Sequence, residues 1–131
     1  MIEKHYEKLE EAIQFFKNIQ FYTWSKKIYN DRRGYIEGTI VFVDKSLLEF
    51  AVYTDLDDKN KLKYRYHYMD GKNNLIFRYD NAPHHKEIRT FPHHKHLKNK
   101  VVESTEITLF EVLSEVDKYM RQKSSGSRQK R

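Results

Sequence analysis

The sequence predicts an α+β fold, in which an antiparallel meander sheet of four to five strands is flanked by N- and C-terminal helices. Two observations support this prediction. Apolar residues recur at helical spacing near both ends of the chain, and apolar runs separated by turn-forming residues fill the middle. The 131 residues are enough for one domain with a sizeable core. Ten Tyr and eight Phe should supply much of that core.

The first predicted element is an amphipathic helix over residues 3–20. Tyr6, Leu9, Ile13 and Phe16 fall at helical spacing, and many of the residues between them are Glu and Lys. This spacing gives the helix one apolar face, which we expect to pack on the sheet.

Five apolar runs follow this helix and are predicted as strands. Polar or turn-forming segments end each run, and Asp70-Gly71-Lys72-Asn73 between the last two runs is a strong hairpin signal. The predicted strands are Trp24–Tyr29, Tyr35–Val43, Leu47–Tyr53, Leu62–Met69 and Asn74–Asp80. Their short connections favour an antiparallel meander.

Alternation along the last two of these strands predicts one aromatic face and one polar face. If the hairpin loop holds an even number of residues, Arg65, His67, Arg78 and Asp80 share the polar face. The residues expected on the aromatic face are Leu62, Tyr64, Tyr66, Tyr68, Leu75, Phe77 and Tyr79. The polar face would then lie beneath the segment that follows Asp80.

Residues 81–100 show no clear period and are predicted to be the longest irregular stretch, a feature that is often functional in a compact domain. Within it the tetrapeptide Pro-His-His-Lys occurs twice, at 83–86 and at 92–95, and His96 follows the second copy. The stretch therefore holds five of the seven histidines. Histidine exchanges protons near neutral pH, and five imidazoles are poor core material, so a reaction site is predicted here.

A second helix is expected to begin near Thr108, because Thr108 and Glu111 fit a capping box. The apolar stripe of this helix consists of Leu109, Val112, Leu113, Val116 and Met120. We expect residues 1–123 to form a single domain and residues 124–131 to form a disordered basic tail.

The net charge of +6 is unevenly distributed along the chain. Residues 59–100 contain 11 basic and 3 acidic residues, so this segment has a net charge of +8. A field of that sign attracts phosphate backbones, unless folding brings the acidic helical segments beside it and cancels the field. The sequence leaves both outcomes open.

Two runs of residues in this basic segment form a recognisable signature. They are Arg78-Tyr79-Asp80-Asn81-Ala82-Pro83-His84-His85 and Phe91-Pro92-His93-His94-Lys95-His96. They resemble the signature of the TumE family of toxin–antitoxin proteins, and the similarity extends over residues 20–120. Glu49 and the Tyr-Arg-Tyr-His-Tyr strand at 64–68 also fit the family's pattern.

This resemblance implies a toxin that acts as a ribonuclease on an RNA substrate. It also implies a cognate antitoxin, which we expect to be a small DNA-binding protein that forms a hetero-oligomer with the toxin. An acidic or aromatic segment of the antitoxin, laid across residues 80–96, would block RNA.

RNA cleavage without a metal requires a base, an acid and cations near the phosphate. Adjacent histidines on an extended chain point to opposite sides, so we predict that His94 and His96 act together, with His85 and Asp80 close by. Asp80 could orient one of the rings. The further catalytic candidates are Arg78, His93 and His84, and the RNA-binding candidates are Lys86, Arg89, Lys95 and Arg65.

A metal-dependent nuclease is the first alternative. His94 and His96 could supply two ligands, and His84, His85 or Asp80 a third, for Zn²⁺ or Mn²⁺ with an open position for water. The spacing does not match an established zinc motif, so no cofactor is predicted.

A non-catalytic RNA-binding module is the second alternative. In it Tyr64, Tyr66 and Tyr68 would stack on bases. Tyrosines at every second position of a strand belong more often to the core, which favours catalysis over this interpretation.

The cellular compartment is predicted from what the sequence lacks. No run approaches the roughly 20 apolar residues of a membrane span, the first residues do not read as a signal peptide, and there is no cysteine. We therefore expect a cytoplasmic protein with no membrane partner.

Overall fold

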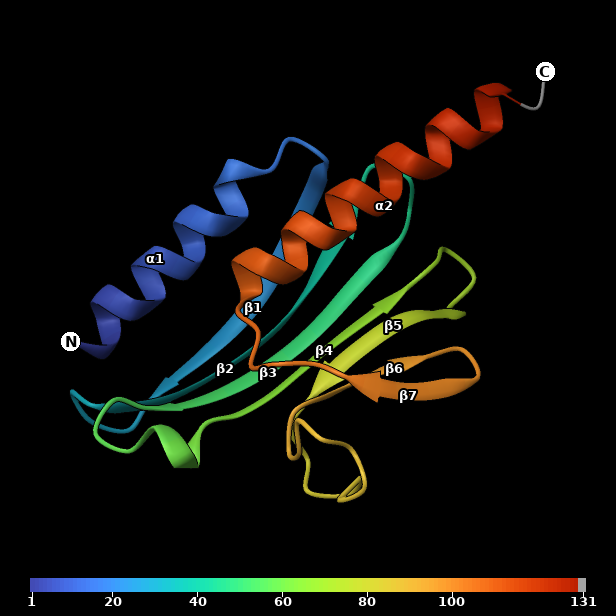
Figure 1. The fold of residues 1–131 in the computed structure, drawn as a ribbon. Coiled ribbons are helices and arrows are strands. Elements are labelled where there is room, and N and C mark those ends of the chain that lie inside the picture. Colours follow the sequence, from blue (N-terminus) through green and yellow to red (C-terminus); the bar gives the residue numbers. More distant parts are fainter. Residues whose placement is uncertain (130–131) are drawn as a thin grey trace.

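The computed structural model contains one seven-stranded antiparallel sheet with two helices on one of its faces (Figure 1). It describes the backbone of residues 1–129 and the side chains of residues 1–124. The elements in chain order are α1 (Ile2–Phe15), β1 (Ile19–Ile28), β2 (Arg33–Phe42), β3 (Leu47–Asp55), the 3₁₀ helix η1 (Lys59–Lys61), β4 (Lys63–Met69), β5 (Leu75–Asp80), β6 (His94–Leu97), β7 (Lys100–Glu103) and α2 (Leu109–Gln129).

The predicted α+β meander is confirmed, because the strands lie in the sheet in chain order and each pairs antiparallel with the next. The predicted number of strands is wrong. Residues 94–97 pair with β5, and residues 100–103 pair with residues 94–97, so two further strands lie in and just beyond the stretch predicted to be irregular. Both strands have only four residues, and His and Lys dominate the first of them, so neither shows an apolar alternation.

The two predicted faces of β4 and β5 are confirmed by their register. Tyr66 lies opposite Tyr79 on one face, and His67 lies opposite Arg78 on the other. The first face packs against α1 and α2, and its aromatic residues are buried; we call it the helix-covered face. Its core residues from β4 and β5 are Tyr64, Tyr66, Tyr68, Phe77 and Tyr79.

The opposite face, which neither α1 nor α2 covers, is called the open face. It continues from β4 and β5 onto β6, where His96 lies opposite Arg78 and His94 lies opposite Asp80. The register of a regular sheet therefore brings the histidines of residues 94–96 beside the charged residues of β5.

Helix α1 is shorter than the predicted range 3–20. It ends at Phe15, since Phe16 is already extended and β1 begins at Ile19, before the strand start predicted at Trp24. Burial explains this change, because Phe16 and Ile19 still pack against the core after the chain leaves the helix.

Helix α2 begins with the predicted capping box. The Glu111 N–H donates to Thr108 Oγ1 at 3.2 Å, and the Thr108 N–H donates to Glu111 Oε1 at 3.0 Å. The helix continues to Gln129, past the predicted domain boundary at residue 123. Residues 130 and 131 of the predicted tail lie outside the described residues, so the boundary stays a prediction. In the described part of the chain, neither helix is long and apolar enough to cross a membrane.

Candidate active site

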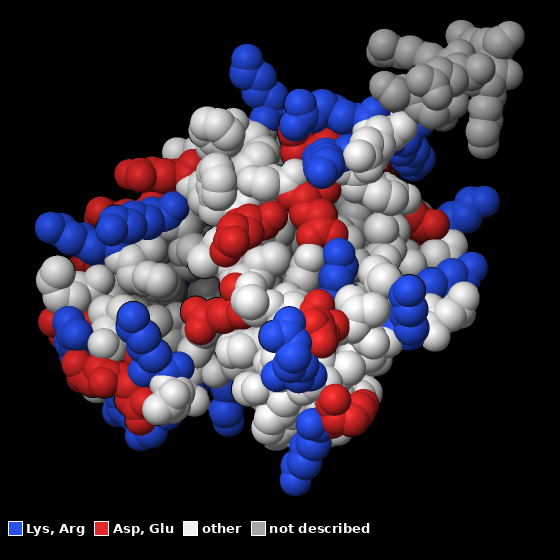
Figure 2. Space-filling view, in the orientation of Figure 1, with Lys and Arg blue, Asp and Glu red and all other residues white. Residues whose placement is uncertain are grey.

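A cavity of about 780 Å³ lies on the open face, between the strands and the loop formed by residues 81–93. Three cationic side chains, Lys63, Arg65 and Arg78, contribute to its lining, against one carboxylate, Asp80. The side of the molecule seen in Figure 2 looks different, since acidic and basic side chains are interspersed there. The basic character predicted for residues 59–100 is thus retained in the cavity, whereas charges of both signs mix on the side seen in Figure 2.

Asp80 and His94 form the floor of this cavity. Asp80 is the last residue of β5 and His94 the first of β6, and their side chains are 9% and 2% exposed. Asp80 Oδ1 lies 2.9 Å from His94 Nε2 and also accepts the N–H of Ala82 at 3.0 Å. On the other side of the ring, His94 Nδ1 lies 2.8 Å from the carbonyl oxygen of Pro92. A carbonyl only accepts hydrogen bonds, so Nδ1 carries a proton and Nε2 faces the carboxylate.

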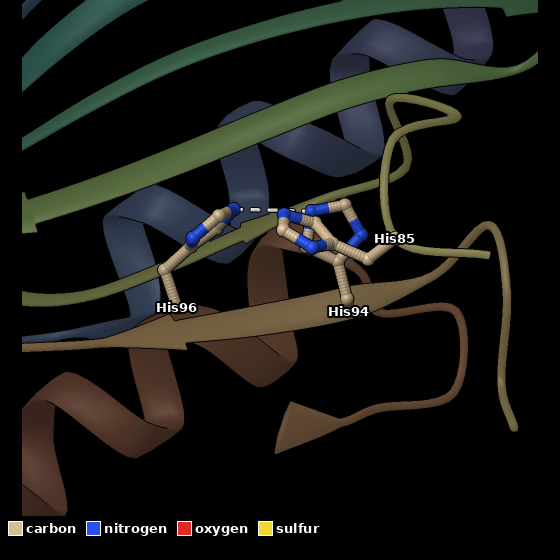
Figure 3. A group of neighbouring side chains, drawn as sticks. All are labelled: His85, His94 and His96. Atoms are coloured by element: carbon tan, nitrogen blue, oxygen red, sulfur yellow. Dashed lines mark hydrogen bonds between the residues drawn. The ribbon is translucent and has the colours of Figure 1, made fainter. Parts of the chain in front are cut away.

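The rings of His85 and His96 gather with that of His94 (Figure 3). As predicted, His94 and His96 point the same way, with their Nε2 atoms 3.1 Å apart. The His85 ring comes from the loop, and its centroid lies 4.9 Å from that of His94 and 5.4 Å from that of His96. The side chains of His85 and His96 are 31% and 25% exposed, so these two rings can meet a substrate while His94 lies beneath them.

The loop that carries His85 is held at both ends by hydrogen bonds. At its start, the side chain of Asn81 accepts the N–H of Tyr64 at 3.0 Å and donates to the carbonyl of Leu62 at 2.7 Å. At its end, Thr90 Oγ1 donates to the carbonyl of His93 and accepts the N–H of Ser104. These contacts hold both ends of the loop that carries His85.

Burial lowers the pKa of His96 below its ordinary value of 6.5, and the positive charges of neighbouring groups, Arg78 among them, act in the same direction. Asp80 opposes this effect, with Oδ2 3.4 Å from His96 Nε2, but does not outweigh it. His96 is therefore mostly neutral at pH 7 and is able to accept a proton.

Arg78 supplies a cation beside the histidines. It lies between His67 and His96 in the register of β4, β5 and β6. Its Nε atom is buried and has no hydrogen-bond partner among the described residues. Arg78 lines the cavity, where its guanidinium could bind an anion, and Arg65 lies on the adjacent strand of the same face.

Two predicted site residues lie on the helix-covered face and not on the open face with the cavity. The reason is that alternate residues of β6 and of the segment before it point in opposite directions. His93 stacks on Tyr64, and its Nδ1 lies 2.7 Å from the tyrosine hydroxyl. Lys95 Nζ lies 2.7 Å from Glu115 Oε2 of α2. The prediction that His93 and Lys95 belong to the site is therefore corrected.

The other predicted residues divide between the cavity and the surface beside it. His84 is exposed and lines the cavity, as Arg65 does. Lys86 is exposed in the loop, and Arg89 forms a two-pronged pair with the carboxylate of Glu103. Neither Lys86 nor Arg89 contributes to the cavity lining.

Tyr35, Tyr53 and Lys63 are among the cavity residues that were not predicted. They lie on β2, β3 and β4, and their side chains share the open face with Arg65. The same alternation that sorts β4 and β5 would have identified the two tyrosines, since Tyr35 precedes the buried Ile36 and Tyr53 follows the buried Val52.

The histidine cluster has the composition of a metal site. One ring nitrogen from each of His85, His94 and His96 lies within 4.8 Å of the others, and Asp80 adds a carboxylate. Imidazole nitrogen and carboxylate oxygen suit Zn²⁺ or Mn²⁺. The cluster therefore fits two chemistries, proton transfer between imidazoles and coordination of a divalent cation.

Comparison with known proteins gives one match. A family model described as Toxin TumE matches residues 9–123 of the chain. No curated protein and no solved structure matches it.

Proposed function

Since the chain belongs to the TumE family of toxins, we propose that it is the ribonuclease toxin of a toxin–antitoxin system and cleaves RNA in the cavity of the open face. The observation that carries this proposal is the histidine cluster. His85 and His96 reach the cavity from two different elements, and the buried carboxylate of Asp80 and the cation of Arg78 lie beside them. These are the groups that RNA cleavage through the 2′-hydroxyl requires.

The proposed reaction transfers two protons. Neutral His96 accepts the proton of the 2′-hydroxyl, and the 2′-oxygen attacks the adjacent phosphorus. The bond from phosphorus to the 5′-oxygen breaks, and protonated His85 donates a proton to that oxygen. The products are a 2′,3′-cyclic phosphate and a 5′-hydroxyl, and Arg78 stabilises the negative charge on the phosphate during the reaction.

His94 acts in this scheme as a positioning residue. The sequence paired it with His96 as a catalytic residue, but its side chain is 2% exposed and contacts Asp80, Pro92 and His96. A ring that is held at both nitrogens can fix the orientation of His96 beside it.

Metal-dependent cleavage is the second candidate, and the spacing of the three ring nitrogens favours it. In that case His85, His94 and His96 would hold the ion, and the ion would activate water or polarise the phosphate. The two candidates use the same residues and differ in their response to chelation.

The test uses purified protein and mixed RNA, in EDTA and with added Zn²⁺ or Mn²⁺. Metal-free catalysis predicts that the wild type cleaves in EDTA and that His96→Ala and His85→Ala each lose about 10²–10⁴-fold in rate. The matched control is His93→Ala, which removes a histidine of the same segment on the other face. Cleavage only with added metal would select the second candidate. Binding without cleavage in any condition would reject both and indicate an RNA-binding module.

An antitoxin partner follows from membership in a toxin family. We propose that this antitoxin, a small DNA-binding protein, places an acidic or aromatic segment over the cavity and its loop. The exposed Lys86 of the loop and the cationic lining of the cavity favour an acidic segment, which would compete with Glu103 for Arg89.

A further inference from the structure

We propose that Tyr35 and Tyr53 form a stacking subsite for an unpaired RNA base, at the end of the cavity away from the histidines. This inference rests on the proposed function and names the substrate class, which is single-stranded RNA. It concerns residues outside the catalytic cluster and outside the signature in the sequence.

The two tyrosines are direct neighbours across β2 and β3. Both are half-buried, and both line the cavity that contains the histidines. The Tyr35 hydroxyl donates to Glu37 Oε2 at 2.9 Å, which restrains its ring. Tyr29 extends the aromatic surface, since its ring centroid lies 6.3 Å from that of Tyr53 and its side chain is exposed.

The position of these rings differs from that of the tyrosines in β4. Tyr64, Tyr66 and Tyr68 lie on the helix-covered face and are at most 5% exposed, so they cannot meet a base. Tyr35 and Tyr53 lie on the open face, where neither α1 nor α2 packs on them. Aromatic rings that line a cationic cavity are typical of surfaces that bind single-stranded nucleic acid.

Two cationic residues lie between the tyrosines and the histidine cluster. Lys63 pairs across the strands with Tyr53, and Arg65 pairs with Ala51 on one side and with Asp80 on the other. A chain that runs from the tyrosines to the histidines would therefore pass these two side chains, which can bind its phosphates.

The register of the strands gives the approximate distance between the histidine cluster and the tyrosines. His94, Asp80, Arg65 and Ala51 lie on neighbouring strands in one row, which spans roughly 14 Å at the usual spacing of strands, and Tyr53 lies roughly 7 Å farther along β3. This separation exceeds the distance between a base and its own phosphate. The stacked base thus belongs to a nucleotide other than those joined by the cleaved bond.

Single-stranded RNA follows from this arrangement. In a duplex the bases stack on one another and present only their edges, so a half-buried ring in the lining of a cavity cannot reach their faces. A flexible strand can turn one base out onto the tyrosines while its backbone follows Lys63 and Arg65 to the histidines.

The test measures binding without cleavage. The probe is a short fluorescent single-stranded oligonucleotide with 2′-O-methyl groups, which cannot be cut through the 2′-oxygen, and affinity is read from anisotropy. We expect Tyr53→Ala to weaken binding roughly 5- to 150-fold, the range of one base–aromatic stack. Tyr53→Phe should keep the wild-type affinity because it keeps the ring. Phe15→Ala, which removes an exposed aromatic residue of α1, is the control.

Two further readouts separate this inference from the proposed function. A probe with abasic sites should bind wild type and Tyr53→Ala equally, and a matched duplex should bind both weakly. Equal affinity of wild type and Tyr53→Ala for the base-containing probe would overturn the subsite, even if His96→Ala abolishes cleavage. Loss of affinity in Tyr53→Ala would support the subsite, even if no condition gives cleavage.

Discussion

Asp80 and His94 are joined across the ends of β5 and β6, with Oδ1 of the carboxylate 2.9 Å from Nε2 of the ring. Because both residues belong to strands, their relative position is set by the register of the sheet and not by the conformation of the loop. The loop contributes His85 to a pair that is already fixed. The candidate site therefore combines a rigid part, from β5 and β6, with one residue delivered by residues 81–93.

Asp80→Asn tests the carboxylate without changing its shape. The variant keeps an oxygen that can accept the N–H of Ala82 but loses the negative charge that faces His94. We expect the free energy of unfolding to fall by about 1.5–3 kcal/mol, as for a buried hydrogen bond to a charged group. RNA cleavage should fall as well, by less than in His96→Ala.

Urea unfolding and initial cleavage rates measure the two effects. Asp57→Asn is the matched control, because the pair of Asp57 with Arg32 is exposed and should contribute at most about 1 kcal/mol. If both variants lose equally little stability, the Asp80–His94 contact is not the anchor that we infer.

The pH dependence of cleavage follows from His96. Its pKa is lowered, chiefly by burial, so the neutral form that accepts a proton is dominant at pH 7 and persists below 6.5. We expect kcat/KM to stay constant as the pH falls from 7 to 6.5. It should decrease only as the pH drops through the lowered pKa of His96. A rate profile between pH 4.5 and 8, at constant ionic strength, would measure it. An acid limb centred above 6.5 would contradict the assignment of His96 as the base.

The same shift affects stability with a defined sign. His96 has a lower pKa in the folded protein than in the unfolded chain, so the unfolded chain binds the proton more tightly. Its contribution to stability is therefore present above pH 6.5 and is lost as the pH falls through the folded-state pKa. Burial also lowers the pKa of His67, which acts in the same direction. His67→Asn should make the free energy of unfolding less sensitive to acid. It should not change the decrease of kcat/KM at low pH, which we assign to His96.

The sequence predicted the part of the site that depends on strand periodicity. Alternation correctly separated Arg65, His67, Arg78 and Asp80 from the aromatic face, and it placed His94 and His96 on one side. Periodicity succeeds here because a strand has only two faces, and the register of one hairpin then fixes both.

The sequence could not predict which residues come together from separate elements. The four-residue strands β6 and β7 have too little alternation to be recognised, and the burial of His94 depends on its pairing with Asp80. The partner of Lys95 was missed for a related reason: Glu115 lies on α2, and only the packing of that helix on the sheet brings the two together.

Lys95→Ala should affect stability and leave RNA binding unchanged. Lys95 Nζ is paired with Glu115 and lies 4.9 Å from the ring centroid of Tyr79, on the face opposite the cavity. We expect a loss of about 1 kcal/mol in the free energy of unfolding, typical of a partly buried ion pair with a cation–π contact. Arg65→Ala, in contrast, should leave stability nearly unchanged, weaken RNA binding and reduce its salt dependence by about one phosphate contact. Urea unfolding and titrations at several salt concentrations distinguish the two variants, and weaker RNA binding in Lys95→Ala would contradict the placement of Lys95.

Competition between RNA and the antitoxin provides the last prediction. If an acidic segment of the antitoxin covers the cavity and its loop, the double variant Lys86→Ala, Arg89→Ala should bind the antitoxin about 2- to 30-fold more weakly, the effect of two exposed charges. Lys95→Ala, on the opposite face, should bind it as the wild type does. Biolayer interferometry with the purified antitoxin measures both, and the 2′-O-methyl oligonucleotide should be displaced by the antitoxin in the same titration. If Lys95→Ala weakens antitoxin binding equally, or if oligonucleotide and antitoxin bind at the same time, the antitoxin does not cover the cavity. It would then bind the helix-covered face and inhibit the toxin indirectly.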